Sequence, residues 1–196
     1  MTLRSCFLTL IVVLSGCSGT LTSEEEPLRE YWLFPDATLF SSDPRLKGVG
    51  VSVAIDAPRG MDRIELLHLE PTGQLREYAG ARWTDNASVI VANYLRLALE
   101  RATGLAIAGT TNAVDARLNL ELRELYTRRA ANGDEAILYV VSTITCGPRS
   151  TASGGTHTSP VQSEQLAAVV AAHRENLDAL SRSVKDQLVA TCAVRT

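Results

Sequence analysis

The sequence has few of the residues that most catalytic and metal-binding sites need. It holds 3 His and 4 Cys among 196 residues, and no two histidines stand at the spacing of metal ligands. It also lacks the Gly-x-Ser-x-Gly elbow of hydrolases, the Gly-Lys-Ser/Thr phosphate loop and the His-Glu-x-x-His pattern of metalloproteases. These absences argue against an enzyme, and they leave no residue assigned to a metal or a cofactor.

The few candidate catalytic groups do not form a convincing set. His68 falls in an expected strand and His173 on the apolar face of an expected helix. Thr151, Ser153 and His157 could imitate a nucleophile and its base. A glycine-containing segment rarely holds such groups to the tolerance that catalysis needs, so we expect no catalytic residue.

Positive charge is also scarce. The chain carries 19 Lys and Arg against 22 Asp and Glu, a formal net charge of −3. A mildly acidic protein lacks the electrostatic footprint of a nucleic-acid binder and the polybasic patch that binds anionic lipid. The charge balance therefore excludes nucleic acid as a partner. The length of the chain suits one domain.

A long hydrophobic run is missing too. The apolar run Cys6–Leu14 is much shorter than the about 20 residues that a membrane-spanning helix needs. It follows the single positive residue Arg4 and leads into small residues before Cys17, which is the arrangement of an export signal. The end of this segment, Leu-Ser-Gly-Cys17, resembles the lipobox of bacterial lipoproteins.

That resemblance implies that residues 1–16 are a signal peptide, that Cys17 receives a diacylglyceryl group, and that its new amine is acylated, for example with palmitate. Two or more acyl chains anchor a protein stably, at about 0.8 kcal/mol per buried methylene. Ser18, where an inner-membrane lipoprotein commonly has Asp, implies the outer membrane, facing the periplasm. An ordinary secretory signal with an incidental cysteine is the alternative. Residues 17–30 are predicted to be a lipidated linker, and residues 31–196 the domain.

Two further cysteines, Cys146 and Cys192, belong to the predicted domain. An even pair in an oxidising compartment favours a disulfide, which in the chain-entropy model stabilises the fold by about 4 kcal/mol. Two buried free thiols are the alternative. The absence of a Cys-x-x-Cys pattern argues against a catalytic redox pair.

Alternation of apolar and polar residues predicts most of the strands. The pair Asn132-Gly133 favours a type I′ hairpin, so we expect the two strands around it to be antiparallel. The second of these is apolar on both faces and is expected inside the sheet. The predicted strands are 49–55, 64–69, 74–78, 105–108, 114–123 and 135–145.

Two helices are predicted. The first opens after Trp83, with Thr84 or Asp85 as its N-cap, and ends at Gly104, where glycine best adopts a left-handed conformation. The second is long, from a Ser159-Pro-Val-Gln start signature to about residue 190. Between the strands and this helix, residues 149–158 are rich in Gly, Ser and Thr and fit a loop, with pairing of residues 149–156 as an edge strand as the alternative.

The second helix carries an apolar stripe that packs either on its own sheet or on a partner helix. Its members recur every three or four residues: Leu166, Val170, His173, Leu177, Leu180, Val184 and Leu188.

A small aromatic cluster, Tyr31-Trp32-Leu33-Phe34, ends the linker. It forms either a first short strand or an apolar plug, and its side chains serve either the core or a ligand. Tyr31, Trp32 and Phe34 are therefore the candidate partner-binding residues.

The order of these features resembles a family, the auxiliary lipoprotein component of ABC-type transport systems, which includes the PqiC-type lipoproteins. The resemblance spans roughly residues 17–190 and rests on order and spacing. After the lipobox come Tyr31-Trp32-Leu33, Val49-x-Val51-x-Val53, Met61-Asp-Arg63-Ile64, Tyr78, Trp83, a long helix, a strand hairpin and a C-terminal helix.

The resemblance implies an α+β fold, with a single antiparallel-rich β-sheet and two main α-helices packed on one face. It also implies a non-enzymatic subunit that docks or scaffolds the transport of lipid, or another apolar solute, between the two membranes. The implied partners are an MCE-domain protein, an ABC permease with its ATPase, phospholipid, and further copies of the chain in a ring. Cys146, Cys192 and the Gly/Ser/Thr-rich segment depart from the family pattern. The alternative is a stand-alone lipoprotein that binds lipid or a small molecule in an enclosed pocket.

Overall fold

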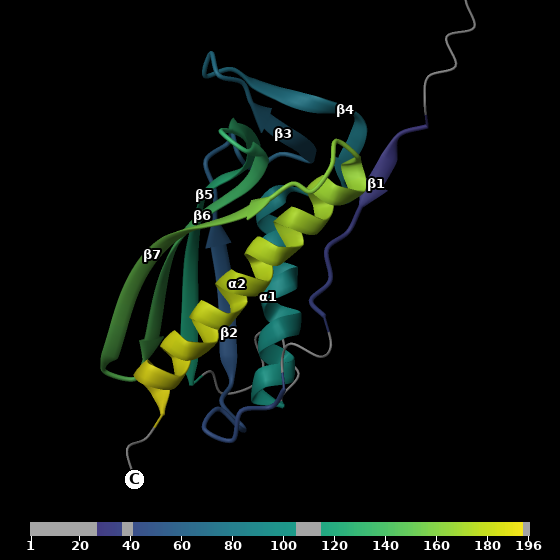
Figure 1. Ribbon diagram of the computed structural model, residues 1–196. Coiled ribbons are helices and arrows are strands. Elements are labelled where there is room, and N and C mark those ends of the chain that lie inside the picture. Colours follow the sequence, from purple (N-terminus) through teal and green to yellow (C-terminus); the bar gives the residue numbers. More distant parts are fainter. Residues whose placement is uncertain (1–26, 37–40, 105–114, 194–196) are drawn as a thin grey trace, which may run out of the picture.

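The computed structural model describes residues 27–36, 41–104 and 115–193, and its order of elements is shown in Figure 1. The predicted signal peptide, Cys17 and the predicted strand at 105–108 lie outside the described residues. The elements are β1 (Arg29–Tyr31), β2 (Val51–Asp56), β3 (Glu65–Leu69), β4 (Leu75–Trp83), α1 (Ala87–Thr103), β5 (Ala116–Ala130), β6 (Gly133–Cys146), β7 (Arg149–Pro160) and α2 (Leu166–Cys192).

The strands of the described residues form one sheet, in the order β1-β4-β3-β5-β6-β7, with β2 also paired to β5. The predicted α+β class and the single sheet are confirmed, although the sheet is mixed. The pairs β3–β4, β5–β6 and β6–β7 are antiparallel, whereas β1–β4, β2–β5 and β3–β5 are parallel. Parallel neighbours need a long crossover, and α1 lies in the connection that returns the chain to β5.

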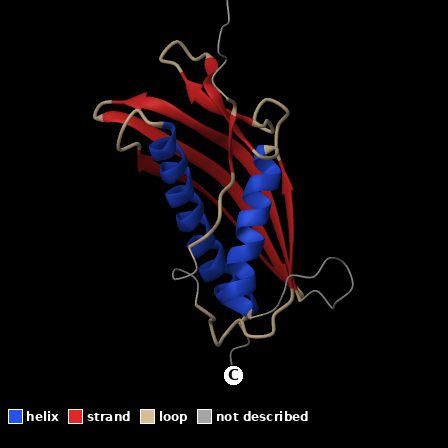
Figure 2. Cartoon of the chain, turned by 90° about the vertical axis from the view of Figure 1, so that its right-hand side faces the viewer, coloured by secondary structure: helices blue, strands red, loops and turns tan. Residues whose placement is uncertain are grey.

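Both helices lie side by side on one face of the sheet (Figure 2). The predicted stripe of α2 is buried from His173 to Leu188, whereas Leu166 and Val170 at its start are only half-buried. The prediction that α2 packs on its own sheet is thus confirmed. Neither helix of the described residues is long and apolar enough to cross a membrane.

The space between sheet and helices is filled by large side chains. Those with almost no exposed surface include Trp83, Tyr94, Leu118, Leu122, Leu138 and Ile144. Tyr94 of α1 donates a 2.5 Å hydrogen bond to Asp178 of α2. Burial, followed by this bond, raises the pKa of Tyr94, so the phenol stays protonated and ties the two helices together.

The predicted hairpin between β5 and β6 is confirmed, and β6 lies inside the sheet as expected. The turn residues differ from the prediction by one position. Ala130 pairs with Gly133, so Ala131 and Asn132 are the central residues rather than Asn132 and Gly133. Gly133 has a φ of 123°, which a residue with a side chain rarely adopts.

The start of α1 is capped from another part of the chain. Asn86 stands at the N-cap without a side-chain hydrogen bond, and Asp62 Oδ1 accepts from the Ser88 amide at 3.1 Å. The predicted caps, Thr84 and Asp85, are therefore wrong, because a loop carboxylate already satisfies the first-turn amide. The end of α1 at Gly104, with φ 69°, is confirmed.

The predicted start of α2 is also wrong. Ser159 and Pro160 lie in β7, and α2 begins at Leu166. The Ser159 hydroxyl donates to Asn176 Oδ1 at 2.8 Å instead of capping a helix. Residues 149–158 form an edge strand, the second of the two predicted options, because β7 pairs with β6 along its whole length.

Candidate partner-binding surface

The N-terminal segment is held at both ends before it crosses the helices. Residues Arg29 and Glu30, predicted as linker, belong to β1 and pair with β4. The Thr84 amide donates to the Tyr31 carbonyl at 3.1 Å. Residues 32–36 then run along the helical face (Figure 2), where Arg101 of α1 donates to the Pro35 carbonyl at 2.8 Å. The segment is therefore fixed to both layers of the fold.

Buried and exposed side chains alternate along this segment. Leu33 is buried, with 3% of its surface exposed, whereas Trp32 and Phe34 are 39% and 59% exposed. The two exposed rings lie 5.6 Å apart, centre to centre, at an angle of 30°. Leu33 therefore acts as the apolar plug, while Trp32 and Phe34 present a pair of aromatic rings to solvent.

These rings border a hollow against the first turns of α2, which we call the aromatic groove. Its volume is about 330 Å³. Ala167 and Ala171 stand one helical turn apart on the same face, and their small side chains leave the space open. The groove is lined by Trp32, Leu33, Phe34, Ala167, Val170, Ala171 and Arg174.

Exposed apolar side chains concentrate in the N-terminal segment, and two of them border the aromatic groove. Of the large hydrophobic residues exposed in the described part of the chain, Leu28, Trp32 and Phe34 fall in the N-terminal segment, and Leu75 lies at the start of β4. Clustered exposed apolar groups mark interaction sites, and aromatic side chains are frequent anchors in them. The sequence pointed to Trp32 and Phe34 but not to Leu28, which stood in the predicted linker.

The lining residues from α2 were not predicted individually. Val170 belonged to the apolar stripe, but Ala167 and Ala171 carry no signal of their own. Arg174 is exposed at the rim and is the positively charged residue of the lining. The groove can therefore accept an apolar side chain whose neighbour carries a carboxylate.

His173 lies close to this surface in the sequence but has a structural role. It is 1% exposed, and its ring meets the Trp83 ring edge-on at 5.6 Å. Its Nδ1 has no hydrogen-bond partner among the described residues. Burial lowers the pKa of His173 to about 4, so the imidazole is neutral at neutral pH.

The residues that could imitate a nucleophile and base are not brought together. Ser153 Oγ lies 3.0 Å from Ser142 Oγ and 3.2 Å from Gln187 Oε1. His157 stands four residues further along β7, about 13 Å away in an extended strand. His68 is bonded elsewhere, at 2.9 Å from Thr127 Oγ1. These polar groups hold strands and helix together.

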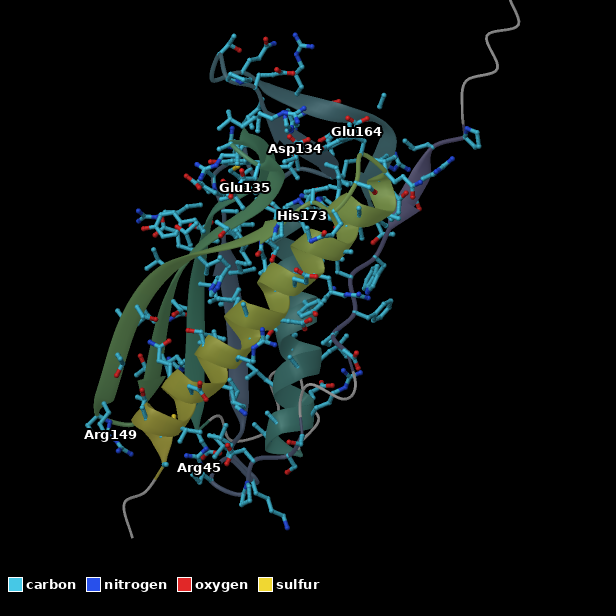
Figure 3. All side chains as sticks on the ribbon, in the orientation of Figure 1. Arg45, Asp134, Glu135, Arg149, Glu164 and His173 are labelled. Carbon is cyan, nitrogen blue, oxygen red and sulfur yellow. The ribbon has the colours of Figure 1, made fainter. Side chains whose placement is uncertain are left out.

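The two cysteines of the domain lie at the other end of α2. Cys146 ends β6 and Cys192 ends α2, and both are thiols in this structure. Figure 3 shows Arg149, the first residue of β7, beside that end of the helix, with His173 towards the opposite end. A helix as long as α2 separates this pair from the aromatic groove by roughly 30–40 Å.

Comparisons with known proteins agree with the fold. The family model described as "ABC-type transport auxiliary lipoprotein component" matches residues 40–185. The crystal structure of protein XCC0632 from Xanthomonas campestris, of the DUF330 family, is similar with a TM-score of 0.67 at 19% identity, covering 83% of this chain and 95% of that one. An uncharacterized protein gives a TM-score of 0.65 at 12% identity, covering 82% and 98%. No curated protein matches the chain.

Proposed function

Because the chain belongs to the family of ABC-type transport auxiliary lipoprotein components, we propose that it is the outer-membrane subunit of an envelope transport system. Its role is to dock or scaffold the movement of lipid, or another apolar solute, between the inner and outer membranes. The partners are an MCE-domain protein and the ABC permease with its ATPase. The chain itself performs no chemistry in this role.

The proposed anchor is the lipid on Cys17, after removal of the signal peptide 1–16, and the protein faces the periplasm. Fully extended, the chain from Cys17 to Leu28 reaches at most about 40 Å. The domain would thus stay close to the membrane while its helical face remains free to meet a partner.

The observation that supports docking is the aromatic groove. Trp32 and Phe34 expose large apolar surface on a segment that β1 and Arg101 hold in place. Little conformational entropy is then lost when a partner binds. The partner chemistry that fits is an apolar segment followed by a carboxylate, which would reach Arg174.

The alternative, a stand-alone lipid carrier, needs an enclosed apolar pocket between sheet and helices. Three hollows lined by described residues lie elsewhere: one lies between the N-terminal segment and α2, one at the β5–β6 turn, and one along β4. The side chains that fill the interface also leave this alternative without a specific observation in its favour.

The test is affinity purification of the full-length lipoprotein from detergent-solubilised native membranes, with mass spectrometry of the proteins and lipids recovered. Three forms are compared: the natural chain, the double variant Trp32→Ala/Phe34→Ala, and Leu75→Ala as a matched control. Leu75 is also an exposed large apolar residue, but it lies outside the groove. We expect an MCE-domain protein or permease with the natural chain and with Leu75→Ala, and at least a tenfold loss with the double variant.

If that partner were recovered equally with all three forms, the aromatic groove would not be the docking site. Recovery of lipid without a protein partner would replace docking by an independent carrier. Flotation of the non-lipidated domain with phospholipid vesicles measures a third outcome. If the domain floats, and the double variant does not, the groove binds the membrane rather than a protein.

A further inference from the structure

The end of α2 is fastened to the β6–β7 hairpin by several contacts. Gln187 Nε2 donates to the Thr151 carbonyl at 3.1 Å, and Thr191 Oγ1 lies 3.2 Å from Thr151 Oγ1. Thr151 pairs with Ile144 of β6, two residues before Cys146. The last turn of the helix thus lies directly over the end of β6.

These contacts bring the two cysteines together. Cys192 is 7% exposed and belongs to the main hydrophobic core, and Cys146 is half-buried and packs against that core. Burial raises the pKa of Cys192, and the neighbouring Cys146 thiol adds to this effect. Neighbouring thiols on two separate elements are the arrangement from which a disulfide forms.

We propose that Cys146 and Cys192 form a disulfide that latches the end of α2 onto the β6–β7 hairpin. This proposal rests on the proposed function in one respect, since export places the chain in an oxidising compartment. The bond would close a loop that contains all of β7 and α2. It would hold the start of the edge strand β7, which pairs with β6 on one side only, in place.

The structure also assigns an order of reaction. Cys146 is the more accessible thiol, whereas Cys192 is buried and its burial raises the pKa of its thiol, so the first attack is assigned to Cys146. The Cys146 thiolate attacks an external disulfide, forms a mixed disulfide, and releases one external thiol. Cys192 then loses its proton and attacks the Cys146 sulfur, releasing the second external thiol. The protein loses two electrons and two protons, and the external disulfide is reduced to two thiols.

The first test is peptide mapping of the protein purified from its native compartment, alkylated with N-ethylmaleimide without reduction and digested with trypsin. We expect the peptides 130–149 and 186–195 to be joined, and to separate on reduction. Reduced protein incubated with oxidised glutathione should form the same linkage. Failure to form it in that buffer would overturn the proposal, whereas the proposed function is read independently from the Trp32 and Phe34 variants.

The second test concerns the latch itself. Reduction should lower the thermal midpoint of the natural protein by about 10 °C and leave a Cys146→Ser/Cys192→Ser variant unchanged. An equal midpoint with and without reductant in the natural protein would contradict a stabilising latch.

The order of attack has its own readout. With oxidised glutathione, Cys192→Ser should accumulate the glutathione adduct on Cys146 at least tenfold faster than Cys146→Ser accumulates it on Cys192. Equal rates would refute the assigned order.

Discussion

The two ends of α2 use the same helix in opposite ways. At the first turns, Ala167 and Ala171 leave a hollow, and the neighbouring side chains Trp32 and Phe34 face solvent. At the last turns, Leu188 and Cys192 are buried against the sheet. The first turns of α2 thus lie beside exposed apolar surface, which we call the open end, whereas the last turns bury their apolar side chains, which we call the closed end.

This difference separates surface kept for a partner from surface used for folding. Burying apolar area stabilises a fold by about 25 cal/mol per Å², so exposed rings at a fixed position forgo stability that the chain could have gained. The last turns of α2 bury their apolar side chains and so contribute this stabilisation to the fold. We therefore expect substitutions to act on stability at the closed end and on association at the open end.

The largest effect is expected from Leu188→Ala at the closed end. Leu188 has no exposed surface, and such a truncation costs about 2–5 kcal/mol in the free energy of unfolding. Urea unfolding followed by circular dichroism measures it. The matched change at the open end is Val170→Ala, on a half-buried side chain, and it should cost less than about 1 kcal/mol. An equal loss of unfolding free energy for the two variants would contradict the difference between the two ends of α2.

A second effect comes from pH. The buried His173 has a pKa of about 4, against 6.5 when unfolded, so the unfolded state binds the proton first. Stability is constant above pH 6.5, falls as the pH drops towards 4, and loses roughly 3 kcal/mol across that window. Urea unfolding at a series of pH values between 4 and 8 measures the slope.

The control for this pH dependence is His173→Leu, which removes this titrating group and should reduce the slope strongly. His157 adds a smaller slope of the same sign, because burial and the nearby Arg182 also lower its pKa. Arg45 holds the pKa of Asp43 at about 2, below its ordinary 3.8, so the contribution of Asp43 is lost only below that range. The same slope in His173→Leu as in the natural protein would show that His173 is not its origin.

The smallest effect is expected from Phe34→Ala. Because this ring is mostly exposed, the free energy of unfolding should change by no more than about 0.5 kcal/mol. Its buried neighbour Leu33 provides the comparison, since Leu33→Ala should lower the free energy of unfolding by about 2 kcal/mol or more. Thermal unfolding of the two variants side by side measures both. A large loss for Phe34→Ala would mean that the exposed ring supports the fold.

Sequence patterns predicted those elements in which one face is exposed to solvent and the other is buried. In β5 the alternation of Leu118, Leu120 and Leu122 with charged and polar neighbours identified a strand. The same reasoning could not decide β7, because its side chains are small or polar and its stability comes from backbone pairing with β6. The start of α2 was misplaced for a related reason, since Ser159 and Pro160 have a helix-start signature but pair with β6.

The candidate surface was predictable only in part. Trp32 and Phe34 were identified by their aromatic character and their place at the end of the predicted linker. Leu33, between them, turned inward because of the extended alternation of the segment. The hollow itself depends on Ala167 and Ala171, and small residues on a half-buried helix face give no sequence signal for an open space.

The position of β5 has a consequence for the order in which the chain folds. One edge of β5 pairs with β2 along residues 116–121 and with β3 at Thr127 and Arg128, while its other edge pairs with β6. The β5–β6–β7 ribbon closes through short turns. By contrast, the residues of β2 and β3 that pair with β5 are more than 50 positions away from their partners in the sequence, although β3 also pairs with the nearby β4. Since distant contacts form slowly, we expect the ribbon to form first and to serve as the template on which the N-terminal strands, and finally the segment with Trp32 and Phe34, assemble.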